Sequence, residues 1–135
     1  MADIRRVTDG LAVAPQLLPQ DMATAAALGY RLVINNRPDG EQPGQPTAAE
    51  MQAAAESAGL AYHHIPILGG ASPQQLQTMA DAIAQADGPT LAFCRSGTRS
   101  ITAWAVGRAV AGDDRHQLAE QAATAGYDLS AVLGV

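Results

Sequence analysis

The chain has one cysteine, Cys94, which lies between an apolar run and a stretch of helix-forming residues in the segment LAFCRSGTRS. A thiol at the start of a helix is close to unpaired backbone N–H groups and to the positive end of the helix dipole. Both features stabilise the thiolate, which is the nucleophilic form of cysteine. Cys94 is therefore the candidate nucleophile, and a small buried hydrophobe is the alternative for a lone cysteine.

The residues after Cys94 have the composition of an anion-binding loop. Gly97 permits a backbone conformation that other side chains resist, and such a loop can turn several N–H groups toward an anion. Arg99 carries a planar fork of donors that binds an oxyanion through two hydrogen bonds. We expect Cys94 and Arg99 to be catalytic and the rest of the loop to bind the anion: Arg95, Ser96, Gly97, Thr98 and Ser100. For Arg95, a side chain that faces solvent is the alternative.

Alternating strand and helix patterns must position this loop. Apolar, β-branched runs predict strands over 11–15, 30–36, 61–67 and 89–94. Helical patterns occupy 20–28, 47–58, 72–87, 99–111 and 114–125. Thr47 with Glu50, and Ser72 with Gln75, form capping-box patterns, and Asp113 or Asp114 is the expected cap of the last helix.

This alternation predicts an α/β fold in one domain over residues 1–135. We expect a central, four- to five-stranded, mostly parallel sheet with helices on both faces. The segment 89–94 is almost entirely apolar and should be a central strand. Sites in such sheets lie at the carboxyl ends of the strands, which is where Cys94 stands.

Composition excludes several functions. The net charge is −5, and all eight basic residues are arginine, so no lysine is present for Schiff-base chemistry. The sequence has no stripe of basic residues that would suggest nucleic-acid binding. No apolar run reaches the roughly 20 residues that span a membrane. The first residues have no apolar segment typical of a secretory signal, and a lone cysteine cannot form an internal disulfide. We therefore expect a cytoplasmic protein that binds neither nucleic acid nor membranes.

The chain resembles the bacterial beta-lactamase hydrolase-like proteins, specifically their phosphatase-like domain, which is also called a sulfurtransferase. The similarity rests on three segments: VTDGLAVAPQLLPQDMATAAALGYRLVINNRPDGEQ, YHHIPI and FCRSGTRS. It implies the fold of the dual-specificity and tyrosine phosphatases. In that superfamily a Cys-x5-Arg loop forms a phosphocysteine, its arginine binds the phosphate, and an aspartate on another loop protonates the leaving group.

The sequence departs from this pattern twice. Its loop is Cys-x4-Arg, one residue shorter and close to the Cys-Arg-Ser-Gly-x-Arg-Ser loop of rhodanese sulfurtransferases. The loop expected to supply the acid is LGGASPQQ, and no carboxylate occurs between Pro66 and Asp81. Asp39 or Glu41 is a candidate substitute acid, with a solvated turn as the alternative. Arg37 in the same loop could bind substrate or form a salt bridge.

Three functions therefore stay open. We favour a sulfurtransferase that takes sulfane sulfur from thiosulfate or glutathione persulfide and passes it to an external thiol, because this reaction needs no strong general acid. A phosphatase of the dual-specificity type is the first alternative, and a non-catalytic oxyanion- or persulfide-binding module is the second. We expect no cofactor. His63 and His64 alternate along a strand without metal-ligand spacing, so we expect no metal either.

Overall fold

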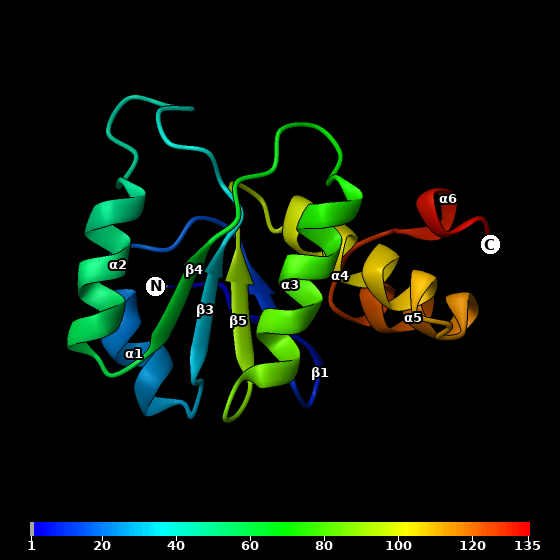
Figure 1. Cartoon of the computed structure of the whole chain (residues 1–135), viewed down its shortest axis with the longest axis horizontal. Helices are drawn as coiled ribbons and strands as arrows, with labels where there is room; N and C mark the ends of the chain where they lie inside the picture. Colours follow the sequence, from blue (N-terminus) through cyan, green and yellow to red (C-terminus); the bar gives the residue numbers. More distant parts are fainter. Residues whose placement is uncertain (1) are drawn as a thin grey trace.

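The computed structural model describes residues 2–135, and its elements alternate as the sequence predicts (Figure 1). The strands are β1 (Arg5–Thr8), β2 (Leu11–Ala14), β3 (Leu32–Asn35), β4 (Ala61–His64) and β5 (Thr90–Phe93). The helices are α1 (Asp21–Ala27), α2 (Ala48–Ser57), α3 (Pro73–Gln85), α4 (Thr98–Val110), α5 (Arg115–Thr124) and α6 (Ser130–Leu133).

The five strands form one sheet in the order β1-β2-β5-β3-β4. Only the β1–β2 pair is antiparallel, and the other pairs are parallel. The predicted fold class is therefore confirmed. Every residue of β2, β3 and β5 is buried, as expected for strands covered on both faces.

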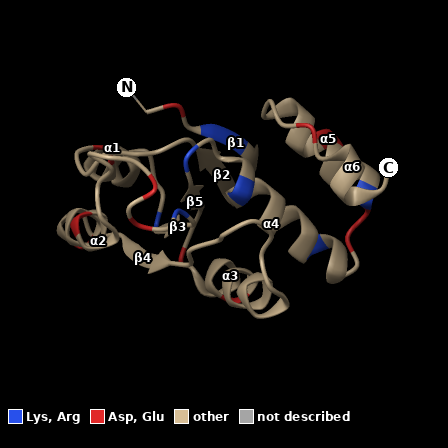
Figure 2. Ribbon diagram, turned by 90° about the horizontal axis from the view of Figure 1, so that it is seen from above, with Lys and Arg blue, Asp and Glu red and all other residues tan. Residues whose placement is uncertain are grey.

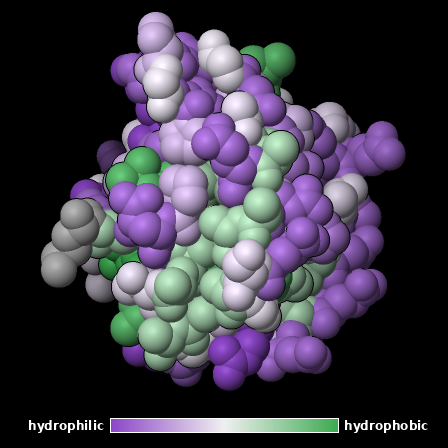
Figure 3. Space-filling view, turned by 90° about the vertical axis from the view of Figure 1, so that its left-hand side faces the viewer, coloured by the Kyte–Doolittle hydropathy of each residue, from purple (hydrophilic) through white to green (hydrophobic). Residues whose placement is uncertain are grey.

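Two apolar layers enclose the sheet. On one face, α1 and α2 pack on side chains that include Val33, Leu91 and Phe93. On the other, α3 to α6 cover a layer that includes Ile34 and Trp104. Figure 2 shows the same separation from above. The outer surface of the α1 and α2 side is mixed, with weakly hydrophobic areas among polar residues (Figure 3).

Local capping explains where the helices begin. Both predicted capping boxes are present, Thr47 with Glu50 at α2 and Ser72 with Gln75 at α3. Asp114 caps α5 by accepting from the His116 N–H at 2.9 Å. No described helix has the length and apolar character that crossing a bilayer requires.

Two elements, β1 and α6, were not predicted from the sequence. The edge strand β1 reads RRVT, so it has no apolar run, and its register with β2 is irregular between Arg6 and Thr8. The helix α6 is only four residues long. Both are stabilised by tertiary packing, because β1 pairs with β2 and α6 buries Leu133 in the core.

Candidate active site

Cys94 is the first residue after the central strand β5, at the carboxyl edge of the parallel strands. The residue is fully buried, yet its sulfur is not enclosed by hydrocarbon alone. The backbone N–H of Gly97 donates a hydrogen bond to the Cys94 Sγ, with an N···S distance of 3.1 Å. The sulfur therefore lies at the N-terminal end of α4, where a negative charge is favoured.

Gly97 makes this contact possible through its backbone conformation. Its φ is +90°, in the left-handed region that favours glycine, and it is the N-cap of α4. A Cβ at this position would lie 2.2 Å from the hydroxyl oxygen of Tyr127. That hydroxyl donates to the Ser96 carbonyl at 2.9 Å, so Tyr127 packs directly against the loop.

The other loop residues differ in exposure and in the hydrogen bonds that their polar groups already form. Ser96 and Thr98 are exposed, and the Ser96 hydroxyl donates to Thr98 Oγ1 at 3.0 Å. Ser100 is buried, and its Oγ has no hydrogen-bond partner among residues 2–135. Arg95 is exposed, while its carbonyl accepts from the Gln16 N–H at 3.2 Å. The Arg95 side chain thus faces solvent, which was the alternative to a role in anion binding.

Arg99 turns its guanidinium toward a carboxylate from a distant loop. Its Nη1 and Nη2 donate to the two oxygens of Glu41, each at 2.8 Å, and Nη1 also donates to the Ile67 carbonyl at 2.9 Å. The hydrogen bonds that Arg99 donates to Glu41 are the main cause that raises the pKa of Arg99, and nearby Cys94 adds to the increase. The guanidinium is thereby held beside the thiol in a geometry suited to a bidentate oxyanion.

Glu41 bridges two arginines. Besides Arg99, it accepts from Nε of Arg37 at 2.8 Å, and its side chain is 24% exposed. Hydrogen bonds from Arg99 first, and from Arg37 second, lower the pKa of Glu41 from 4.5 to about 2. In this arrangement the two guanidinium groups hold the carboxyl group in its ionised form, so it has no proton to donate while both pairs persist.

Asp39 is not placed to act as the acid either. Its Oδ1 accepts from the Ala48 N–H at 2.8 Å, so it satisfies an unpaired donor in the first turn of α2. The Asp39 carboxylate is therefore occupied by a hydrogen bond at the start of α2. Of the two candidate acids, the structure brings Glu41 to Arg99 and leaves Asp39 at α2.

Arg37 is buried, with 2% of its side chain exposed, and forms the salt bridge that was the alternative to substrate binding. Its Nη1 and Nη2 donate to Gln16 and Gln42, each at 3.0 Å. His64 bonds to the Arg37 carbonyl through Nε2 at 2.9 Å. Arg37 therefore acts as a buried support for Glu41, and His64 holds the backbone of the same loop.

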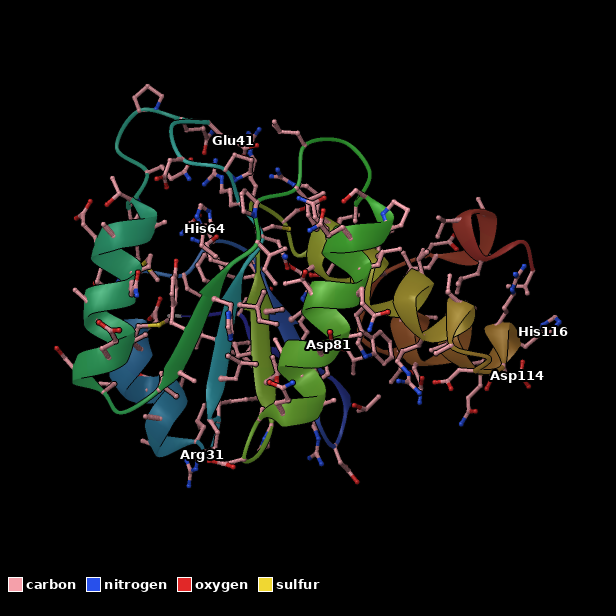
Figure 4. The ribbon with its side chains drawn as sticks, in the orientation of Figure 1. Arg31, Glu41, His64, Asp81, Asp114 and His116 are labelled. Atoms are coloured by element: carbon pink, nitrogen blue, oxygen red, sulfur yellow. The ribbon has the colours of Figure 1, made fainter. Side chains whose placement is uncertain are left out.

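Figure 4 places Glu41 and His64 at one edge of the sheet, whereas Asp81, Asp114 and His116 lie along α3 and α5, away from that edge. Among residues 2–135, no three histidine, cysteine or carboxylate side chains are grouped as metal ligands.

Sequence reasoning did not identify Tyr127 or Gln16 as parts of the site. Each is far from Cys94 along the chain and carries no motif. The topology brings Gln16, just after β2, and Tyr127, just after α5, against the loop. Only the tertiary arrangement could have revealed these two contacts.

Comparison with known proteins identifies the family and the fold of this chain. The sequence profile of the family described as "Beta-lactamase hydrolase-like protein, phosphatase-like domain" matches residues 3–111. Beta-lactamase hydrolase-like proteins from Agrobacterium fabrum and Xylella fastidiosa are 35% and 37% identical over 128 and 125 residues. These alignments cover 93% and 91% of the chain but only 30% and 29% of the relatives, so the chain spans under a third of their length.

Solved structures show the same fold. A protein from Neisseria meningitidis Z2491, provisionally called a phosphatase, has a TM-score of 0.85 and 33% identity, over 97% of this chain and 94% of that one. P. aeruginosa TpbA in complex with pTyr has a TM-score of 0.66 at 18% identity, over 94% of this chain and 76% of that one. The latter likeness concerns the fold alone. Taken together, the family match and the Neisseria structure show that this chain has a phosphatase-like fold.

Proposed function

Because the chain belongs to the family described as the phosphatase-like domain of beta-lactamase hydrolase-like proteins, we propose that it is an enzyme whose nucleophile is the Cys94 thiolate. We further propose that the transferred atom is sulfur, taken from a small anionic donor and passed to an external thiol. One observation carries this choice: among residues 2–135, neither candidate acid is free, because Glu41 is paired with two arginines and Asp39 accepts from the Ala48 N–H.

Phosphate-ester cleavage depends on such an acid, which contributes about 10²–10⁴-fold to the rate. Glu41 is ionised by two arginines, Asp39 binds the end of α2, and the loop after β4 has no carboxylate before Asp81. Sulfane-sulfur donors release sulfite, a sulfinate or a thiolate, which leave without a strong acid. The groups that are present therefore match the demands of sulfur transfer.

The proposed reaction uses three groups of the loop: the Cys94 thiolate, the Gly97 N–H and the Arg99 guanidinium. The Cys94 thiolate attacks the sulfane sulfur of thiosulfate, a new S–S bond forms, and the S–S bond of thiosulfate breaks with its electron pair leaving on sulfite. The Gly97 N–H, already 3.1 Å from Sγ, stabilises negative charge at the sulfur, and Arg99 binds the sulfonate oxygens in place of Glu41. An external thiolate then removes the outer sulfur and regenerates Cys94.

A phosphatase is the second candidate, and the similarity to phosphatase-like proteins is the observation that favours it. In that reaction Cys94 attacks phosphorus and forms a phosphocysteine that water hydrolyses. With no free acid at the site, substrates with activated leaving groups, such as aryl phosphates, should be cleaved far better than alkyl phosphates.

Intact-mass spectrometry after incubation with thiosulfate separates the candidates. An adduct of one sulfur atom on wild-type protein, absent from Cys94→Ser, is the expected result, and addition of dithiothreitol should remove it. No sulfur adduct, together with efficient hydrolysis of phosphopeptides, would establish the phosphatase instead. No turnover in either assay, with anion binding retained, would indicate the binding module.

Arg99→Ala should lower kcat/KM by at least about 100-fold, because the oxyanion loses a bidentate partner. Arg108→Ala is the matched control: Arg108 is on the same helix but pairs with Asp113 at 2.8 Å. Full activity in Arg99→Ala would exclude the role assigned to its guanidinium.

A further inference from the structure

A groove of about 370 Å³ lies beside the cysteine loop and has Arg99 in its wall. Its lining residues come from the loop that precedes α3, from α3 and α4, and from α6. Most of its lining is apolar, contributed by Ile67, Leu76, Ala103, Val106 and Val132. The reaction proposed above uses Arg99 but none of these apolar side chains.

The chemistry of the lining restricts what can occupy it. Arg99 is the only charged side chain among the described residues that line the groove, and the hydroxyls of Thr98 and Thr102 are the only side-chain polar groups besides it. The apolar wall is accessible, because Val132 is 52% exposed. An occupant that covered these groups would gain free energy by removing them from water.

The groove and the anion site are continuous because they share Arg99. The guanidinium that pairs with Glu41 also lines the groove, and Ile67 both accepts from Arg99 and contributes to the apolar wall. A molecule whose oxyanion replaces Glu41 therefore has its remaining atoms next to the groove.

We propose that this groove binds an aryl or alkyl group attached to the anionic substrate, so that the enzyme selects apolar organic anions over compact inorganic ones. The inference rests on the proposed function, because it assumes that Arg99 binds the substrate's oxyanion. Among sulfane-sulfur donors, it points to thiosulfonates, R–SO₂–S⁻, in which R enters the groove. Of the residues that line the groove, Val132 lies beyond residues 3–111, which the family profile matches.

The chemical step with such a donor balances without a further reactant. The Cys94 thiolate forms an S–S bond to the terminal sulfur, and the bond between that sulfur and the sulfonyl sulfur breaks. The electron pair leaves on the sulfinate, R–SO₂⁻, and Cys94 retains the persulfide.

Binding of unreactive anions tests the groove apart from catalysis. Titration with benzenesulfonate and with methanesulfonate, followed by calorimetry and by amide chemical shifts, should show at least about tenfold tighter binding of the aryl anion. Its shift changes should extend along α4 to Thr102 and Val106. Equal affinity for the two anions, or shifts confined to residues 94–99, would overturn the proposal.

A charged side chain placed in the apolar wall tests the role of the groove during turnover. Val132→Asp should lower kcat/KM for benzenethiosulfonate about tenfold and leave that for methanethiosulfonate nearly unchanged. Val135→Asp is the matched control: Val135 is 41% exposed and is not among the residues that line the groove. The proposal fails if Val132→Asp affects both donors equally while its far-ultraviolet circular dichroism matches wild type.

The two assays distinguish the groove from the reaction. Preferential binding of benzenesulfonate, with no persulfide from any donor, would support the role of the groove and refute sulfur transfer. Persulfide formation with no preference among donors would retain the reaction and refute the groove.

Discussion

At the level of single residues, Glu41 determines the charge around Arg99. Its carboxylate occupies both terminal nitrogens of the guanidinium that a substrate oxyanion would use. It also neutralises the buried Arg37, which would otherwise be a costly isolated charge. Glu41 therefore orients Arg99 in the free protein and competes with the substrate for it.

Glu41→Gln should separate these two effects. We expect KM for an anionic substrate to fall severalfold, because a neutral amide competes less well for Arg99. We also expect the free energy of unfolding to fall by about 1–3 kcal/mol, because Arg37 loses its counter-charge. Steady-state kinetics and urea denaturation measure these quantities, and Glu56→Gln on the exposed side of α2 is the control. An unchanged KM would show that Glu41 does not compete with substrate.

The same carboxylate predicts a pH dependence of stability. Its pKa is about 2 in the folded protein, below the ordinary 4.5, so the ionised form is favoured by folding. Its contribution is complete above about pH 4.5 and is lost as the pH falls toward 2. The stability difference between wild type and Glu41→Gln should therefore shrink over this interval in urea titrations. A constant difference would contradict the ion pairing described here.

At the level of elements, the loop between β5 and α4 depends on a contact from the end of the chain. Tyr127 follows α5, and its hydroxyl donates to the Ser96 carbonyl. Its ring also lies 5.3 Å from the Arg5 guanidinium, so it joins β1 to the loop. The positive φ of Gly97 and the close approach of Tyr127 together aim the Gly97 N–H at the sulfur.

Gly97→Ala should be the most damaging conservative change in the loop. The Cβ would meet Tyr127 at 2.2 Å, and the φ of +90° adds strain of about 1–2 kcal/mol. We expect a loss of at least about 100-fold in kcat/KM as the N–H leaves the sulfur. Kinetics and thermal unfolding test this, and wild-type activity would contradict the assigned geometry.

Tyr127→Phe is a milder probe of the same loop. Loss of the hydrogen bond to Ser96 should cost about 0.5–1.5 kcal/mol of stability. Tyr30→Phe, a change of the same kind away from the loop, is the control. If the hydroxyl positions the loop, Tyr127→Phe should also lower kcat/KM, whereas Tyr30→Phe should not.

At the level of the whole molecule, the parallel strands form the rigid support of the site. β5 has β2 on one side and β3 on the other, and it ends at Cys94. Amide hydrogen exchange should therefore be slowest in β5 and β3 and faster in the edge strands β1 and β4. Exchange followed by NMR checks this, and rapid exchange throughout β5 would contradict the arrangement.

Local signals in the sequence were sufficient for most of the fold. Apolar runs predicted β2, β3 and β5, the segment AYHHIPI predicted β4, and the capping residues Thr47 and Ser72 predicted where α2 and α3 begin. The strand β1 and the helix α6 were missed because both are short and gain their stability from neighbours. The confirmed fold class followed from the alternation of elements.

The sequence by itself determined the α/β class, the position of Cys94 at the end of a central strand, and the presence of Gly97 and Arg99 in one short loop. These follow from local periodicity, which needs no knowledge of distant contacts. Only the tertiary structure decided that Glu41 pairs with Arg99, that Asp39 accepts from an N–H in the first turn of α2, and that Tyr127 and Val132 lie beside the loop. Apart from the contact of Asp39, such contacts join residues tens of positions apart, and they form because the parallel sheet brings its strand ends to one edge.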